Sequence, residues 1–201
     1  MQIIPTILEK DFSEAEKRVG LVKDLSTWLQ IDVTDAVYTL GKTFELERLN
    51  KVEFSLNNNL IDIHLMVKEP KSWLKKAFFV GASRVIGQVE MMSDRDEFIK
   101  IIKDEGVEAG LAFDIDTEVD DNIPEDTDLI LLMGRKTGFG SGELSEKVFK
   151  KIARLKQINK DIKIGVDGGI NLENINKLEE AGIDVAYCGK DYIRIKENYV
   201  G

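Results

Sequence analysis

The segment Leu60-Ile61-Asp62-Ile63-His64-Leu65-Met66 is a short apolar run that carries the only histidine of the chain near its end. Two other apolar segments contain an aspartate at or near their ends, Trp28-Leu29-Gln30-Ile31-Asp32-Val33 and Ile162-Lys163-Ile164-Gly165-Val166-Asp167-Gly168-Gly169. Such runs, with little polar alternation, are typical of parallel strands that are covered on both faces. Taken singly, His64 suits a hydrogen-bonded core position and each aspartate suits the cap of a following helix. If the strands are parallel neighbours, however, Asp32, His64 and Asp167 converge, and their equivalent positions favour one shared site.

Similar runs recur along the whole chain, at residues 2–8, 27–33, 60–66, 84–89, 108–113, 129–133, 163–167 and 185–189. Most of the stretches between them have apolar residues at helical spacing. We expect helices over residues 12–25, 94–105, 145–158 and 171–181, with Asp11 or Ser13, Ser93 and Asn171 as caps. Helix-like stretches end at Gly81, Gly106 and Gly182, and a strand follows each. Eight such repeats favour an α/β fold that is a closed (β/α)₈ TIM barrel over an open sheet.

The chain shows no linker or composition break, so we expect one barrel domain over residues 1–201. This length is short for such a barrel, which typically has about 250 residues. Only residues 190–201 follow the last strand, and we therefore expect the last helix to be short or absent. A shortened helix leaves barrel surface that a second subunit could cover, which predicts a homo-oligomer.

The net charge is −9, which argues against nucleic acid and anionic membranes as partners because both select basic surfaces. No segment approaches the roughly 20 apolar residues of a membrane span. The first residues lack the pattern of a signal peptide, and the single cysteine, Cys188, allows no internal disulfide. We therefore expect a cytoplasmic protein with a small-molecule partner.

Residues at the carboxyl ends of barrel strands face the active-site mouth. Asp32, His64 and Asp167 all fall at that end, and the period of two along a strand places Gln30 on the same face as Asp32. Two carboxylates, an imidazole and a neutral amide suit a divalent metal ion such as zinc, iron or manganese. The spacing of these residues in the sequence is not specific for a metal site. The prediction rests on their equivalent positions at the ends of their strands.

Glycines follow three successive strands, in Gly138-Phe139-Gly140-Ser141-Gly142, Gly168-Gly169 and Gly189-Lys190. Glycine lets backbone N–H groups approach an anion closely, and phosphate in these barrels commonly binds at the loops after strands seven and eight. The alternative is that these glycines only make tight turns. Three adjacent loops of this kind favour a phosphate group.

Several phrases together resemble the ribulose-phosphate 3-epimerase family. They are Pro5-Thr6-Ile7-Leu8, Gln30-Ile31-Asp32-Val33-Thr34-Asp35-Ala36, Asp62-Ile63-His64-Leu65-Met66, Leu131-Leu132-Met133, Gly138-Phe139-Gly140-Ser141 and the unaltered Val166-Asp167-Gly168-Gly169-Ile170. The similarity spans nearly the whole chain in the family's order. It implies a barrel of the ribulose-phosphate-binding type and an isomerase of carbohydrate metabolism that acts in the pentose phosphate pathway.

The resemblance implies that Asp32 and Asp167 bind one divalent metal ion (zinc, iron, manganese or cobalt) with His64. It also implies that the same two aspartates act as acid and base, epimerising a ketose phosphate at its third carbon. Residues that would bind the substrate and its phosphate are Thr6, Met66, Met133, Gly138, Phe139, Gly140, Ser141, Gly168, Gly169, Gly189 and Lys190.

The chain departs from the family pattern at several positions. Gln30 stands where the family has its first histidine ligand, and an amide oxygen is a weaker, harder donor than imidazole. Thr34 replaces a methionine, Lys190 replaces a serine, and Arg135-Lys136-Thr137 replaces Val-Asn-Pro. Lys190 either reaches the phosphate as a point charge or is a solvated surface lysine. These changes leave two alternatives open: an epimerase for another phosphoketose such as allulose 6-phosphate, and a phosphosugar-binding barrel without turnover.

Overall fold

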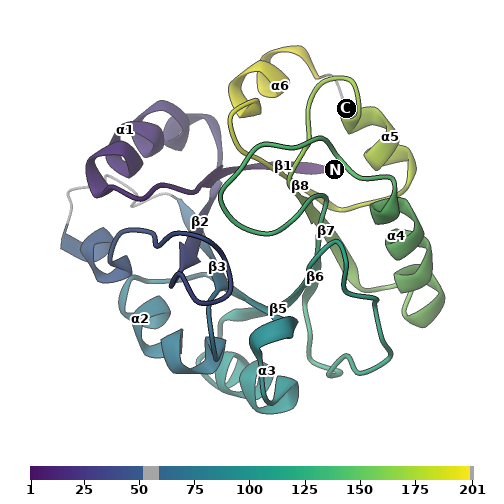
Figure 1. The fold of residues 1–201 in the computed structure, drawn as a ribbon, viewed down its shortest axis with the longest axis horizontal. Coiled ribbons are helices and arrows are strands. Elements are labelled where there is room, and N and C mark those ends of the chain that lie inside the picture. Colours follow the sequence, from purple (N-terminus) through teal and green to yellow (C-terminus); the bar gives the residue numbers. More distant parts are fainter. Residues whose placement is uncertain (52–58, 200–201) are drawn as a thin grey trace.

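The computed structural model describes residues 1–51 and 59–199. Eight parallel strands close into a barrel in the order β1 to β8, with β1 paired to β8 (Figure 1). They are β1 Gln2–Ile7, β2 Trp28–Thr34, β3 Leu60–Met66, β4 Arg84–Gln88, β5 Glu108–Phe113, β6 Leu129–Met133, β7 Lys163–Asp167 and β8 Val185–Cys188. The predicted (β/α)₈ barrel is therefore confirmed, and β3, β5, β6 and β7 have the predicted bounds.

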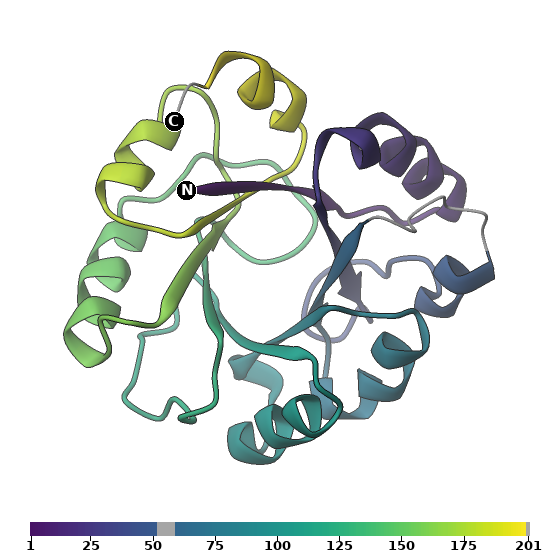
Figure 2. The same ribbon diagram turned by 180° about the vertical axis from the view of Figure 1, so that it is seen from behind.

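Helices surround the ring of strands, as both views of the ribbon show (Figures 1 and 2). The α-helices of the described residues are α1 Phe12–Val22, α2 Leu74–Phe79, α3 Arg95–Asp104, α4 Lys147–Ile158, α5 Ile175–Glu180 and α6 Tyr192–Asn198. Short 3-10 helices are η1 Lys23–Leu25, η2 Leu46–Lys51, η3 Pro70–Trp73 and η4 Val89–Met91. The last α-helix has only seven residues, as the short C-terminal segment predicts.

Three helix starts, those of α3, α4 and α5, differ from the sequence-based expectation, and α4 begins at Lys147 rather than at residue 145. Asp94, not Ser93, caps α3: its carboxylate accepts from the Glu97 N–H at 2.9 Å. The last predicted helix begins at Ile175 rather than at Asn171. The Asn171 side chain accepts hydrogen bonds from the backbone N–H groups of residues 173 and 174, as a capping side chain does, but residues 172–174 form a turn and the regular α-helix begins only after them.

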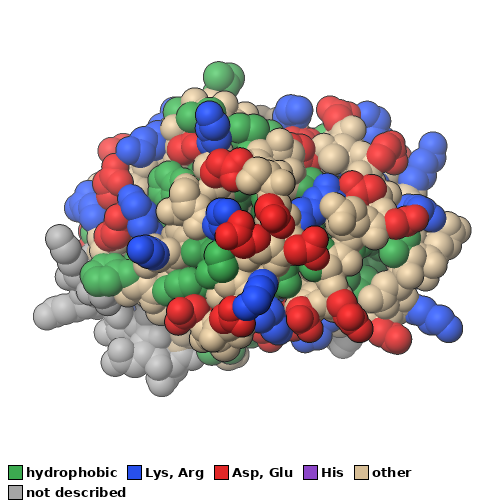
Figure 3. Space-filling view, turned by 90° about the horizontal axis from the view of Figure 1, so that it is seen from below, with side chains coloured by type: hydrophobic (Ala, Val, Ile, Leu, Met, Phe, Trp, Pro, Cys, Tyr) green, Lys and Arg blue, Asp and Glu red, His purple; other side chains and the backbone are tan. Residues whose placement is uncertain are grey.

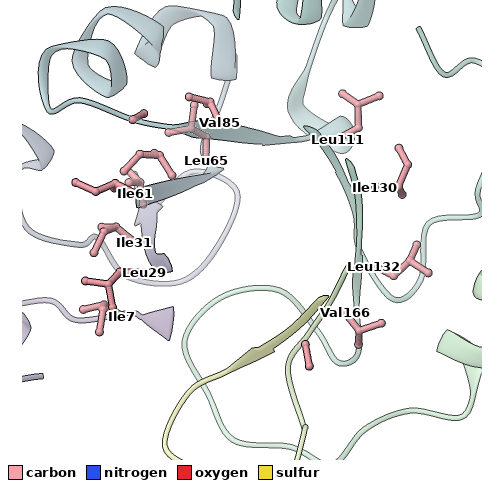
Figure 4. Packing of buried hydrophobic residues seen from close by; sticks show 14 of the residues in the cluster. Ile7, Leu29, Ile31, Ile61, Leu65, Val85, Leu111, Ile130, Leu132 and Val166 are labelled. Carbon is pink, nitrogen blue, oxygen red and sulfur yellow. The ribbon is translucent and has the colours of Figure 1, made fainter. Parts of the chain in front are cut away.

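The apolar core has two parts. The larger part fills the space between the outer faces of the strands and the helices (Figure 4). The smaller part lies inside the barrel and consists of Ile4, Ile86, Ala112, Leu129, Leu131, Met133, Val185 and Tyr187. Strand side chains alternate between the two parts because successive residues of a strand point to opposite faces. On β2 this alternation buries Leu29 and Ile31 against the helices and turns Gln30 and Asp32 inward.

Two long loops curve over one end of the barrel, nearest the viewer in Figure 1 and on the far side in Figure 2. They follow β2 and β6, so this end is the one at which the strands finish. The loops contact each other closely: a Cβ added at Gly138 would lie 2.7 Å from the Cβ of Thr39. The β2 loop also reaches across to β5, since Tyr38 donates its hydroxyl to Asp114 at 2.8 Å. The mouth of the barrel is therefore partly roofed.

Acidic and basic side chains are interspersed over the face seen in Figure 3. Exposed ion pairs of the described residues include Lys100–Asp104 and Arg154–Asp121. Within the described residues, no helix is both long enough and apolar enough to cross a membrane.

Candidate active site

Asp32, His64 and Asp167 converge inside the barrel at its mouth. The strand register places Asp32 beside His64, and β7 brings Asp167 from the other side of the ring. His64 Nδ1 lies 3.0 Å from Asp32 Oδ1 and 4.0 Å from Asp167 Oδ2. All three side chains are buried, and His64 has no exposed surface. The structure thus brings together the three residues that the sequence places at equivalent strand ends, and their roles stay predictions.

The Gln30 amide lies between the two carboxylates. Its Nε2 donates to Asp32 Oδ1 at 3.1 Å and to Asp167 Oδ2 at 3.2 Å. Its Oε1 is buried and has no hydrogen-bond partner among the described residues. Gln30 therefore joins the cluster, as its strand position predicts, but it presents donors to the acids rather than an oxygen to a metal.

The electrostatics of this cluster favour protons on its acidic and basic groups. Burial, reinforced by the charge of Asp32, raises the pKa of Asp167 to about 7. Burial lowers the pKa of His64, but the hydrogen bond and negative charge of Asp32 outweigh it and raise this pKa overall. Two acids that share a buried space thus retain a proton near neutral pH unless another cation replaces it.

The donor set fits a divalent cation. One ligand atom from each of Asp32, His64 and Asp167 lies within 4.8 Å of the other two. Carboxylate and imidazole ligands of this kind suit zinc, iron or manganese. A reversal of the Gln30 amide would turn its unpartnered Oε1 toward the same space and satisfy that buried oxygen. At the position where the resemblance implies a further metal ligand, the chain therefore has a side chain that contains an oxygen atom.

A cavity of about 740 Å³ opens above this cluster. Besides Asp32 and Asp167, every residue predicted to bind substrate or phosphate lines it, namely Thr6, Met66, Met133, Gly138, Phe139, Gly140, Ser141, Gly168, Gly169, Gly189 and Lys190. Gln30 and His64 lie behind the cavity wall. The predicted binding residues therefore surround one cavity, and their individual roles stay predictions.

The loop after β7 is built on two glycines in left-handed backbone conformations, Gly168 with φ +98° and Gly169 with φ +77°. A Cβ at Gly169 would lie 2.4 Å from the backbone nitrogen of Leu144. A side chain would therefore both strain the backbone and push the loop after β6 away. These glycines bring bare backbone of two loops together at the edge of the cavity, which suits close approach of an anion.

Cationic side chains border the same edge. Lys190 is exposed and lines the cavity. Arg18 of α1 donates to the backbone oxygen of Gly189. Arg135 lies against the β7 loop, because a Cβ at Gly168 would come within 2.8 Å of its Cγ.

Sequence reasoning missed Arg18, Gln88 and the Tyr38–Asp114 contact. Arg18 sits on a helix and reaches the mouth only through the packing of α1. Gln88, however, could have been identified from the sequence. It is a polar residue at the carboxyl end of an apolar strand, the same position that marked Asp32 and His64.

Fold and site together define a (β/α)₈ barrel that has two aspartates and a histidine at the carboxyl ends of its strands, beneath a glycine-rich rim. Comparison with known proteins gives the narrower assignment. The chain belongs to the ribulose-phosphate 3-epimerase family, whose model matches residues 2–193. This family consists of carbohydrate epimerases, which are isomerases.

Three relatives named ribulose-phosphate 3-epimerase illustrate the similarity. The protein from Schizosaccharomyces pombe is 28% identical over 193 residues, which covers 94% of this chain and 85% of the relative. The Bacillus subtilis protein is 29% identical over 197 residues, covering 94% and 90%. The protein from Buchnera aphidicola subsp. Acyrthosiphon pisum is 32% identical over 198 residues, covering 93% and 85%.

More distant solved structures share the fold alone. A mutant tryptophan synthase α-subunit from Pyrococcus furiosus matches with a TM-score of 0.72 at 15% identity, over 98% of this chain and 90% of that chain. Phosphoribosyl anthranilate isomerase from Thermus thermophilus matches with a TM-score of 0.66 at 12% identity, over 95% and 88%.

Proposed function

We propose that this protein epimerises a ketose phosphate, with ribulose 5-phosphate as the first substrate to test, by two-aspartate proton transfer at the third carbon. The observation that carries the proposal is the pair of buried carboxylates, Asp32 and Asp167, that face the same space at the barrel mouth within 4.8 Å of His64. Family membership and the glycine-rich rim support the substrate class.

The two aspartates suit acid–base work. One carboxylate takes the proton from the third carbon, next to the ketone, and the electron pair moves into an enediolate. The other aspartate, which carries a proton, returns a proton to the opposite face, so that the configuration inverts with no net gain or loss of protons. A pKa of about 7 for Asp167 suits this exchange, since a general acid or base works best with a pKa near the operating pH.

The residues that would hold a divalent cation are Asp32, His64 and Asp167, with Gln30 through its oxygen after reversal of the amide. When bound, such a cation supplies Lewis-acid stabilisation of the negative charge that develops on the substrate oxygen. The resemblance to the family gives zinc, iron, manganese and cobalt as the candidate ions.

Other residues bind and enclose the substrate. Met66 and Met133 line the cavity and present polarizable apolar surface to the sugar. The β2 and β6 loops contact each other over the barrel mouth, and exclusion of water by them would strengthen charge interactions inside the cavity. The backbone of Gly168 and Gly169 would receive the phosphate, and Lys190 would contribute a point charge at the rim.

Turnover of D-ribulose 5-phosphate to xylulose 5-phosphate tests the proposal directly. The assay is run on folded protein after chelation and again with zinc, iron(II), manganese or cobalt added singly. Conversion that depends on added metal is the expected result. Failure with every metal would overturn this substrate. Turnover of allulose 6-phosphate in a parallel assay would then assign the alternative phosphoketose, and binding of both sugars without turnover would assign a phosphosugar-binding barrel.

A further inference from the structure

Gln88, at the end of β4, contacts the side of His64 that faces away from the two aspartates. The amide atom of Gln88 nearest the imidazole lies 3.3 Å from His64 Nε2 and 3.3 Å from the hydroxyl of Thr137. Both side chains of the Gln88–His64 contact have no exposed surface. Any polar group here must find its partner within the protein, because an unmade buried hydrogen bond costs about 1–3 kcal/mol.

Only one orientation of the Gln88 amide satisfies its neighbours. On its far side, the second amide atom lies 3.2 Å from the backbone oxygen of Ala112 and 2.6 Å from Glu90 Oε2. Both of these are acceptors, so the NH₂ group must point toward them. The amide oxygen then faces His64 and Thr137, each of which has a proton to donate.

Glu90 is itself fixed in place. Its other oxygen, Oε1, accepts from the backbone N–H of Asp114 at 2.7 Å. The contacts therefore run from the backbone of Asp114 through Glu90 and Gln88 to His64. The Glu90 carboxylate fixes the orientation of the Gln88 amide, and that amide presents its oxygen to His64.

We infer that Gln88 is a positioning residue that accepts the Nε2–H of His64 and thereby keeps Nδ1 directed at Asp32 and Asp167. This inference rests on the metal site of the proposed function. The partner on one ring nitrogen decides which nitrogen is available as a metal ligand. With Nε2 held as a donor, Nδ1 is the only ring nitrogen that can offer a lone pair to a cation between the carboxylates.

His64 is the only histidine of the chain, so ¹⁵N NMR of labelled protein reports its imidazole without ambiguity. In metal-free wild-type protein, at a pH at which the imidazole is neutral, we expect its single ring proton on Nε2, the nitrogen identified by its coupling to both carbon-bound ring protons. An unprotonated Nε2 would overturn the inference. This measurement needs neither metal nor substrate, so its outcome is independent of whether the protein is an epimerase.

A pair of variants separates positioning from general support of the barrel. Gln88→Met keeps the length of the side chain but removes the acceptor, whereas Thr137→Val removes the other hydrogen bond to the same oxygen and leaves the acceptor facing His64. In a Zn²⁺ titration of folded proteins, Gln88→Met should bind about 10- to 100-fold more weakly than wild type. Thr137→Val should stay close to wild type and should retain the Nε2 proton.

Equal Zn²⁺ affinity of Gln88→Met and wild type would contradict the inference, as would an equal loss in both variants. If wild-type protein binds no Zn²⁺, the metal site of the proposed function fails, and the NMR of the metal-free protein still decides the role of Gln88.

Discussion

Gln30 on β2 and Asp167 on β7 are joined by a 3.2 Å hydrogen bond across the barrel interior, although 137 positions separate them in the chain. The same amide nitrogen also reaches Asp32, at 3.1 Å. One neutral side chain thus bridges two acids that would otherwise repel each other. Gln30, which departs from the ligand pattern that the family resemblance implies, is therefore still part of the cluster. Its N–H groups offset part of the repulsion between the two carboxylates, as a bound cation would do.

Replacing this bridge by an imidazole should strengthen metal binding. Gln30→His supplies a neutral nitrogen donor that divalent zinc prefers to an amide oxygen, so we expect Zn²⁺ affinity to rise by about tenfold or more, which is about 1.4 kcal/mol. The measurement is a competitive Zn²⁺ titration. Gln157→His, which places the new imidazole on an exposed position of α4, is the control. An unchanged affinity in Gln30→His would show that this side chain does not contribute to a metal site.

Asp167→Asn should stop proton transfer while sparing phosphate binding. The amide cannot accept the substrate proton, but the backbone of the glycine loops is untouched. We expect exchange of the substrate's proton at the third carbon with solvent deuterium to fall at least about a hundredfold, in line with the usual contribution of a general acid or base. The exposed Asp161→Asn, at the opposite end of β7, should exchange as wild type does. Near-normal exchange in Asp167→Asn would refute the role assigned to this aspartate.

The stability of metal-free protein should decrease as pH rises. The native Asp167 pKa of about 7 lies above its ordinary value of 3.8, so between about pH 4 and pH 7 the native state binds more protons than the unfolded state. The free energy of unfolding must then fall with increasing pH over this window. Urea unfolding in the presence of a chelator measures it, and Asp167→Asn should flatten the slope.

Added Zn²⁺ should reverse this trend, because bound metal replaces protons on its ligands and its affinity rises with pH. A slope that is the same in wild type and Asp167→Asn would place the titration elsewhere, for example on the buried Asp62, whose pKa burial also raises.

Most of the barrel strands could be predicted from the sequence because they are near-continuous apolar runs, and tertiary packing does not override this local pattern. The convergence of Asp32, His64 and Asp167 was predictable for the same reason: equal positions on parallel strands meet at one end of the barrel. The start of α5 was less exact: Asn171 accepts from the N–H groups of residues 173 and 174 as a cap does, but the first turn is not a regular α-helical one and α5 begins at Ile175.

The contacts between loops could not be predicted from the sequence. The Tyr38–Asp114 hydrogen bond joins residues 76 positions apart, and the approach of Arg135 to Gly168 depends on how two loops fold over each other. Neither side chain stands out by type or spacing. Only the closed barrel fixes the distance that these loops must span.

Lys190→Ala distinguishes a phosphate ligand from a solvated lysine at the rim of the cavity. An exposed ion pair contributes about 0.5–1 kcal/mol, so the KM for a ketose phosphate should rise roughly two- to fivefold with little change in kcat. The increase should shrink at high salt because the charge is solvent-exposed. Lys160→Ala removes an exposed lysine from the turn before β7, at the other end of the barrel, and should leave KM unchanged. Equal KM values for wild type and Lys190→Ala at low salt would assign Lys190 to the solvated surface and leave phosphate recognition to the glycine backbone.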